Sequence, residues 1–231
     1  MASDAPNVVV LGKDPRPLHE IIVIKGRDDA LAHAGTAADE LVHLKTNPVL
    51  RYWTDASRRG TAEKGPVGAA FCLRSLFAGG GWVDCGMKCH NLSTSAVGEL
   101  HAIAMAMNHA VETLDKLDES ARKEVRIELF SDSTHALQKI TGDREIDSLD
   151  EVTIVRDILE LLRFLPVEPG RVQMFWSPAH SGIAGNERAD EKAGMASKQA
   201  KDLTNFPFVR SGLAPLDWSR AEVADSFQVM I

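Results

Sequence analysis

The sequence predicts an α/β fold with one mixed sheet of five strands, three antiparallel and then parallel, flanked by helices. Three strand-like runs, at residues 49–54, 67–73 and 82–89, follow one another through short links rich in glycine and other turn residues, which favours an antiparallel meander. Two further runs, at 125–130 and 172–176, come after segments with helical periodicity. Helix-linked strands pair in parallel, so the expected order is βββαβααβα.

The first helix is expected to begin at Thr94 or Ser95, either of which is a suitable N-cap. Its buried stripe is predicted from apolar residues at three- and four-residue steps: Ala102, Ile103, Ala106, Ala110, Val111 and Leu114. Glu99 is therefore expected in the first turn, on or near the inward face.

Two helices are expected after the fourth strand, which ends in Ser131-Asp132-Ser133. The first begins at Ser133 or Thr134, and the second, longer one ends at Pro166 and Pro169. A glycine-bearing loop after the fifth strand leads into the last helix, expected over residues 186–198.

The chain is expected to divide into an N-terminal extension (1–48), one domain (49–200) and a C-terminal tail (201–231). A chain of 231 residues, 44% of them hydrophobic, can bury one substantial core. In the extension, residues 8–11 and 21–24 are predicted as strands of an added hairpin or a flap, and residues 28–45 as mildly helical.

Targeting signals and membrane spans are not apparent in the sequence. Apolar runs stay well short of the ~20 residues that a membrane-spanning helix needs. The N-terminus has neither the basic stretch and apolar core of a secretion signal nor the arginines of an import signal. We therefore expect an intracellular protein, in the cytoplasm or nucleus, with no membrane partner.

The three cysteines, Cys72, Cys85 and Cys89, are an odd and low number, which predicts free thiols. A zinc site formed with His90 is not expected. On a strand, Cys85 and Cys89 would lie about 13 Å apart at ~3.3 Å per residue, too far to share one metal ion.

Four acids stand at the ends of the predicted elements. Asp55 closes the first strand and Asp132 the fourth, while Glu99 and Asp190 are expected in the first turns of the first and last helices. Carboxylates brought together repel one another, and hard divalent cations relieve that repulsion. An all-carboxylate set suits Mg²⁺ or Mn²⁺, and two such ions support phosphodiester hydrolysis.

Each of these residues alone has an ordinary explanation. A lone aspartate at a strand end is usually a turn or cap residue, and Glu99 alone would offset the helix dipole. Asp190 alone would belong to a solvated helix face, and His180 alone would be a hydrogen-bonded loop histidine. Their joint placement within one βββαβααβα order favours a metal site.

The strings YWTDAS, GELHAIAMAM, ELFSDSTHAL and WSPAHSGIAGNERADEKA resemble type 1 ribonuclease H, over roughly residues 50–200. The last string is the most specific, because the loop histidine, the asparagine and the final aspartate of that family occur at the expected relative positions. The wording is most similar to ribonuclease H domains of retroelements and their fungal relatives. The resemblance implies a ribonuclease H-like fold.

The resemblance also implies a function and roles for residues. The family cuts the RNA strand of RNA–DNA hybrids and leaves a 5′ phosphate. Asp55, Glu99, Asp132 and Asp190 would hold two Mg²⁺ ions, with Mn²⁺ as a substitute, and His180 would assist proton transfer or product release. The substrate contacts would be Ser57, Arg58, Thr94, Ser95, Ser133 and Asn186, with Asn186 also orienting the loop and the last helix. A monomer is expected.

The sequence departs from the family where the hybrid would be held. Thr94-Ser95-Ala96 stands where members often carry asparagines, and residues 140–169 are acidic where a basic handle would lie. The net charge of −7 also predicts weak, salt-sensitive binding. Arg58, Arg59 and Lys64 are the expected local phosphate contacts.

Two alternatives remain open from the sequence. The first is a non-catalytic nucleic-acid or protein interaction module that keeps the fold, motivated by the acidic handle region and the missing asparagines. The second is a nuclease of related fold that acts on another substrate.

Overall fold

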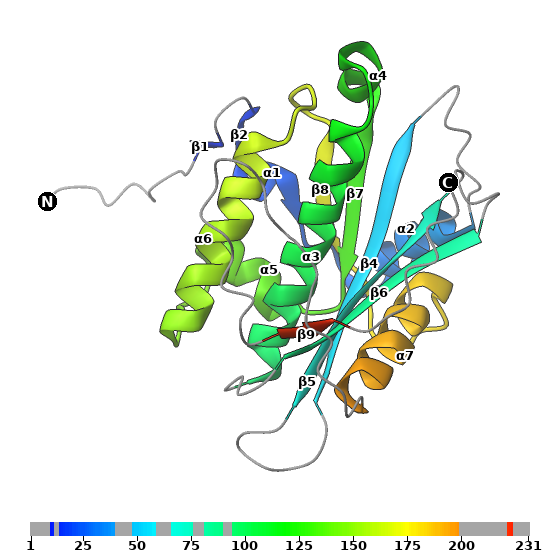
Figure 1. Ribbon diagram of the computed structural model, residues 1–231, viewed down its shortest axis with the longest axis vertical. Coiled ribbons are helices and arrows are strands. Elements are labelled where there is room, and N and C mark those ends of the chain that lie inside the picture. The colour runs from blue at the N-terminus through cyan, green and yellow to red at the C-terminus, as the bar shows by residue number, and fades with distance from the viewer. Residues whose placement is uncertain are drawn as a thin grey trace, which may run out of the picture.

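The computed structural model describes residues 10–11, 14–39, 48–58, 66–75, 81–89, 94–198 and 221–223. One sheet runs through the molecule, in the strand order β3-β8-β7-β4-β5-β6-β9 (Figure 1). Its inner strands are β4 (Val49–Arg58), β5 (Val67–Ser75), β6 (Gly81–Cys89), β7 (Arg126–Ser131) and β8 (Val172–Trp176). Strands β4, β5 and β6 pair antiparallel, whereas β4, β7 and β8 pair parallel, so the predicted mixed sheet is confirmed.

Two short edge strands make this sheet wider than the five strands predicted. Strand β3 (Ile22–Val23) pairs parallel with β8, and β9 (Ala221–Val223) pairs antiparallel with β6. Both come from the segments expected to flank the domain. Residues 21–24 were predicted as a strand but not as part of this sheet, and the three residues of β9 are too few for a pattern to reveal.

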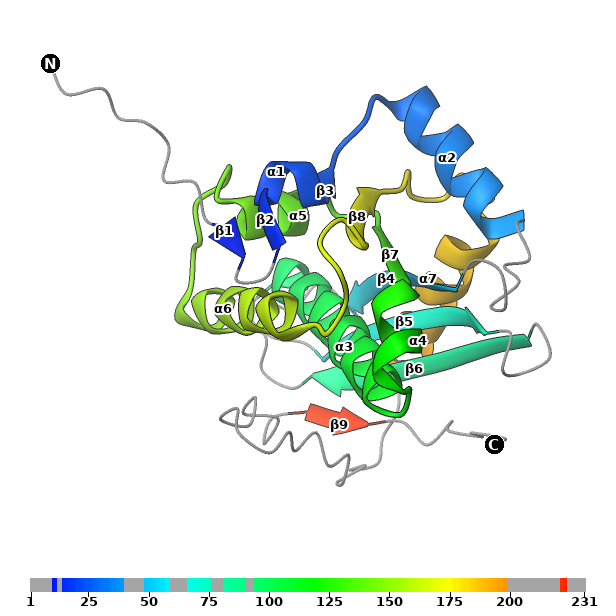
Figure 2. The ribbon, with the colours of Figure 1, turned by 90° about the horizontal axis from the view of Figure 1, so that it is seen from above.

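Helices cover both faces of the sheet (Figure 2). The larger core joins one face to α3 (Ser95–Asp115), α5 (Thr134–Thr141) and α6 (Leu149–Phe164). The smaller core joins the other face to α2 (Arg27–Asp39) and α7 (Ala184–Lys198). Strand β4 is therefore buried without interruption from Val49 to Asp55. In the described part of the chain, no helix is long and apolar enough to cross a membrane.

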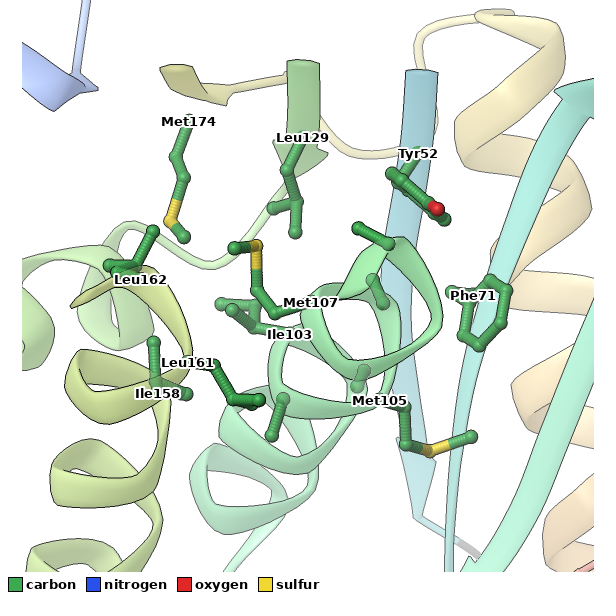
Figure 3. Close-up of a cluster of buried hydrophobic side chains, with 14 of the residues drawn as sticks. Tyr52, Phe71, Ile103, Met105, Met107, Leu129, Ile158, Leu161, Leu162 and Met174 are labelled. Atoms are coloured by element: carbon green, nitrogen blue, oxygen red, sulfur yellow. The ribbon is translucent and has the colours of Figure 1, made fainter. Parts of the chain in front are cut away.

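The side chains of β4 alternate between the two cores. Tyr52 belongs to the larger core, where Figure 3 shows Ile103 of α3, Leu161 of α6 and Leu129 of β7 filling the space between the helices and the sheet. Trp53 points the other way, into the smaller core. Burial of each large apolar side chain contributes ~1.5–3 kcal/mol, so both cores help to hold β4 in the sheet.

Helix ends mostly follow the predicted caps. Thr94 Oγ1 accepts from the Val97 amide at the start of α3, and Ser133 Oγ accepts from the Ala136 amide at the start of α5. Helix α4 (Glu119–Glu124) is not among the predicted helices. Its N-cap is Asp118, whose Oδ1 accepts from the Ala121 amide at 2.8 Å.

The N-terminal extension differs from the prediction in its pairing. Strand β1 (Val10–Leu11) pairs with β2 (Asp14–Pro17), not with residues 21–24. Ile21 ends the short helix α1 (Leu18–Ile21), and the next two residues join the main sheet as β3. Helix α2 begins one residue before the predicted helical stretch of 28–45 and otherwise overlaps it; residues 40–45 lie outside the described residues.

The three cysteines are buried and free, as predicted. Cys85 and Cys89 both lie on β6, and burial raises the pKa of each thiol to about 12. Cys72 on β5 is equally enclosed, and its Sγ lies 3.1 Å from the carbonyl oxygen of Gly185. These side chains fill the core.

Helix α7 begins at Ala184, two residues before the predicted start, and the Glu187 amide donates to the Ile183 carbonyl at 3.0 Å. Gly185 lies in the first turn because the helix passes very close to β4. A Cβ at this position would lie 2.1 Å from the Trp53 ring. The glycine was predicted as part of a loop, whereas it allows helix-to-sheet contact.

Gly185→Ala is expected to lower the free energy of unfolding by about 1–3 kcal/mol, the usual cost of overpacking a core. Gly35→Ala in α2 is the control, because nothing lies within 4 Å of a Cβ there. Replacing that helix glycine should raise the free energy of unfolding by ~0.5–1 kcal/mol. Urea denaturation followed by circular dichroism measures both. Wild-type stability in Gly185→Ala would contradict this account of α7 packing.

Candidate active site

The site lies where β4 extends beyond the end of its parallel neighbour, β7. Pairing between β4 and β7 stops at Thr54 and Ser131, while β4 continues to Arg58 against β5. This is also where the strand order changes direction, since β5 and β6 lie on one side of β4, and β7 and β8 on the other. Ligands in open α/β sheets bind at such points, outside the carboxyl ends of the strands.

One backbone amide of β4 joins two of the predicted carboxylates. The Ala56 amide donates to Asp55 Oδ1 at 2.7 Å and to Glu99 Oε1 at 3.1 Å. Asp55 is only 6% exposed and Glu99 9%. A residue on β4 and a residue on α3 are thus held to one hydrogen-bond donor.

Glu99 reaches this point because α3 approaches the sheet closely. A Cβ at Gly98 would lie 2.4 Å from Val67 Cγ1 and 2.9 Å from Ala56 Cβ, so only glycine fits without displacement. Helix α3 begins at Ser95, which puts Glu99 in the second turn and not in the predicted first turn. Because the N-cap is Thr94 and not the alternative Ser95, the helix begins one residue earlier and Glu99 lies further from its first residue.

Asp132 directly follows the last residue of β7 and is half-buried. Its backbone is held from the neighbouring strand, because Trp176 Nε1 donates to the Asp132 carbonyl at 3.0 Å. Ligand oxygens of Asp55, Glu99 and Asp132 all lie within 4.8 Å of one another. Three acids far apart in sequence therefore form one compact group.

Asp190 lies outside that group of three but acts on it. It is half-buried on α7, in the second turn and not in the predicted first turn, because the helix begins earlier than expected. Burial is the main cause of the raised pKa of Asp55 and of Asp132, and repulsion from Asp190 adds to both shifts. The fourth predicted acid thus lies close enough to this group to repel two of its members, Asp55 and Asp132.

His180 and Asn186 lie on the Asp132 side of the site. His180 is exposed in the loop between β8 and α7. Burial raises the pKa of Asp132, and the nearby His180 and a hydrogen bond from Asn186 partly oppose that rise. Asn186 is 2% exposed in the first turns of α7. His180 has a φ of 47°, in the left-handed region, where non-glycine residues are uncommon.

The other predicted substrate contacts surround the acids less directly. Ser57 and Arg58 are half-buried at the end of β4, and Ser95 is exposed at the start of α3. The hydroxyls of Thr94 and Ser133 accept backbone hydrogen bonds as helix caps. Arg59 and Lys64, also predicted to contact phosphates, lie outside the described residues.

A family model described as RNase H matches residues 47–198, about two thirds of the chain. The chain belongs to the RNase H family. A solved structure of LC11-RNase H1 in complex with an RNA/DNA hybrid is 18% identical, with a TM-score of 0.50 over 64% of this chain and 95% of that one. RNase H1 from the halophilic archaeon Halobacterium salinarum is 26% identical, with a TM-score of 0.45 over 64% of this chain and 96% of that one.

This protein is accordingly a ribonuclease H, a hydrolase, with the predicted RNase H-like fold. The resemblance in the sequence is confirmed at the level of the family. The narrower similarity to retroelement and fungal domains stays a prediction. RNase H enzymes generally use divalent metal ions, and a buried group of three acids is present here.

The electrostatics of this RNase H site fit a bound cation. Burial, followed by repulsion from Asp132, raises the pKa of Asp55 to about 8. Burial and then the charges of Asp55 and Asp132 raise the pKa of Glu99 well above its usual range. Among the described residues, nothing donates a hydrogen bond to the buried Glu99 Oε2 atom. A divalent cation would offset the repulsion and use that free oxygen.

Two contributors to the site were not predicted from the sequence. The Ala56 amide is a backbone group, and no residue type marks it. Gly98 precedes Glu99 in the quoted motif, yet its role depends on how closely α3 meets β5. A glycine within a strongly helical pattern was the only available signal, because such a glycine usually has a packing reason.

Asp55→Asn is expected to raise the melting temperature of the metal-free RNase H. Reversing one unit of pKa shift is worth ~1.4 kcal/mol, or at least about 3 °C for a chain of this size. The raised pKa means that wild-type stability falls as pH rises from about 4 towards 8, the value reached by Asp55. The advantage of Asp55→Asn should therefore grow over that range.

Differential scanning calorimetry at several pH values, with EDTA, makes this measurement. Glu145→Gln removes one charge from an exposed position and should leave the melting temperature nearly unchanged. A lower melting temperature for Asp55→Asn at pH 8 would show that the acids do not repel one another in the folded protein.

Proposed function

We propose that this RNase H cleaves the RNA strand of RNA–DNA hybrids endonucleolytically and leaves 5′ phosphates, with two divalent metal ions. The observation that carries the proposal is the buried group of Asp55, Glu99 and Asp132 at the switch point of the sheet. Burial, together with repulsion from neighbouring acids, raises the pKa of all three, and a stability cost of this kind is typical of functional sites.

Asp55, Glu99, Asp132 and Asp190 are the residues that would hold the ions, which we take to be Mg²⁺, with Mn²⁺ as a substitute. Oxygen ligands of this kind suit both metals. When bound, two such ions stabilise the attacking and leaving oxygens of a phosphodiester. Asp55 interacts with the other three acids, so it is the residue that would contact both ions.

The remaining residues of the site position groups and move protons. The Ala56 amide fixes one oxygen of Asp55 and one of Glu99, so both carboxylates are oriented before substrate binds. Glu99 keeps a free oxygen that can align the attacking water. Asn186 orients Asp132, and the exposed His180 beside it can carry a proton to or from solvent.

Hybrid binding is proposed to be weak in this enzyme. The connection from α5 to α6 has exposed acids at Asp143 and Glu145. Lys139, buried near the end of α5, forms ion pairs with Asp147 at 2.8 Å and with Glu151 at 2.7 Å, so it cannot serve as a basic handle. Ser57, Arg58 and Ser95 remain the proposed contacts to the substrate, and phosphate contacts from so few cations should give only weak binding.

We further propose that the enzyme acts as a monomer in which residues 49–200 form the catalytic domain. Residues 1–48 are then an extension and residues 201–231 a tail. All of the acids discussed above, together with His180, fall within that one domain.

Cleavage of a labelled RNA–DNA hybrid with Mg²⁺ tests the proposal. Asp132→Asn should reduce the rate by at least about 100-fold, since even outer partners of metal ligands typically contribute 10–100-fold. Asp118→Asn is the matched control, because Asp118 caps the distant helix α4 and asparagine caps equally well. Double-stranded and single-stranded RNA should not be cut, and the products should accept no further 5′ phosphate from a kinase.

Each alternative has its own result in this assay. A folded, metal-supplied wild-type protein that cuts no faster than Asp132→Asn would favour a non-catalytic module. Cleavage of single-stranded or double-stranded RNA at the rate of the hybrid would favour a nuclease with a different substrate.

A further inference from the structure

Residues 14–39 pack around the loop that carries His180, although they precede the region matched by the RNase H family model. We propose that this segment is a clamp that positions the His180 loop for catalysis. The proposal rests on the function proposed above, because it assumes that His180 takes part in the reaction. Here the His180 loop means residues 177–183, between β8 and α7.

The clamp holds the strand that enters the loop. Strand β3 pairs in parallel with β8, with Ile22 beside Met174 and Val23 beside Phe175. Arg16 Nη2 donates to the Val172 carbonyl at 3.0 Å, so β8 is held along its outer edge as well. The last strand residues before the loop are therefore fixed from the side away from β7.

Helix α2 holds the loop itself and the residue that leaves it (Figure 2). The His33 ring packs edge-on against Phe175, with centroids 4.4 Å apart. The fully buried Ala34 shares the smaller core with Ile183, the last loop residue. At the start of α2, Arg27 Nη2 donates to Ser181 Oγ at 3.3 Å, one residue after His180.

The other end of α2 is fastened to the sheet. Arg51 Nη1 donates to the Ala37 carbonyl at 2.7 Å, and Arg74 Nη1 donates to the Ala38 carbonyl at 2.9 Å. These are carbonyls of the last turn, where helices lack internal donors and favour positive charge. Two strands of the catalytic domain thus set the direction of a helix that lies outside the family match.

The loop has a reason to need support. His180 is exposed and adopts a φ of 47°, and Gly182 follows with a φ of 75°. Within the loop and its helix, the Gly182 amide donates to Glu187 Oε1 and Ser181 Oγ donates to the Ala179 carbonyl. An uncommon backbone conformation persists only where its surroundings impose it, and the clamp contributes part of those surroundings.

Ala34→Gln tests the clamp, with Ala32→Gln as its matched control. The same uncharged side chain is placed on the buried face of α2 in the first variant and on the exposed face in the second. Both are made in the full chain, alone and combined with His180→Ala. Turnover at saturating hybrid and Mg²⁺ is measured well below the melting temperature of every variant.

Ala34→Gln is expected to lower kcat by about threefold or more, because general acid–base groups contribute about 10²–10⁴-fold only when correctly positioned. It should have no further effect once His180 is alanine, and Ala32→Gln should match wild type throughout. An equal loss of kcat with and without His180 would overturn the positioning role, because the effect would then be merely structural. Wild-type kcat in Ala34→Gln would overturn the clamp.

The two proposals fail in different ways. If His180→Ala cleaves as fast as wild type, the role proposed for His180 is wrong, and the clamp falls with it. If His180→Ala is slow while Ala34→Gln matches Ala32→Gln, only the clamp is wrong.

Arg27→Ala provides a second test that leaves the core untouched, for use if Ala34→Gln does not fold. Lys123→Ala, on the distant helix α4, removes one exposed positive charge as its control. Hydrogen exchange in residues 179–183 should be faster in Arg27→Ala only, with exchange in β4 unchanged. Identical exchange of the loop in the two variants would overturn the contribution of Arg27.

Discussion

Repulsion among buried carboxylates at the end of β4 is the constraint on which the rest of the site depends. Asp55 and Glu99 share the Ala56 amide, and Asp132 lies within reach of both. In water these side chains would separate, so the fold must hold them together. Helices on opposite faces of the sheet do this, with a glycine at each close approach, Gly98 in α3 and Gly185 in α7. The close packing of α3 and α7 on the sheet therefore also creates the group of carboxylates that could bind cations.

The sheet topology converts distant sequence positions into neighbours. Strand β4 lies between β5 and β7. Asp55 on β4 therefore lies near Asp132, which follows β7, although the two are far apart in the sequence. Strand β8 then carries the chain past β7 and delivers the His180 loop and α7 to the same end of the sheet. The N-terminal extension adds β3 beside β8 and packs α2 against the His180 loop. In the proposed clamp, this packing also positions His180.

Much of this was predictable because periodicity and element ends carry strong signals. Alternation and helical spacing predicted the five inner strands and the main helices, and the acids at their ends identified the group that the structure brings together. What escaped prediction depends on tertiary contact. Ala56 contributes a backbone amide, and Gly98 and Gly185 matter only through what they approach. Residues 21–24 were predicted as a strand, but the pairing of β3 with β8 was not. The start of α7 was misplaced because Gly185 was taken as a loop residue.

The most direct test of the account is anomalous diffraction from crystals soaked in Mn²⁺ at a concentration that supports hybrid cleavage. The account predicts strong anomalous peaks in contact with carboxylate oxygens of Asp55, Glu99 and Asp132, all of which disappear in Asp132→Asn crystals or become much weaker. Because the three acids already lie together, little movement of their side chains should accompany binding. An active enzyme whose crystals show no peak at these carboxylates would contradict the central claim that they form its metal site.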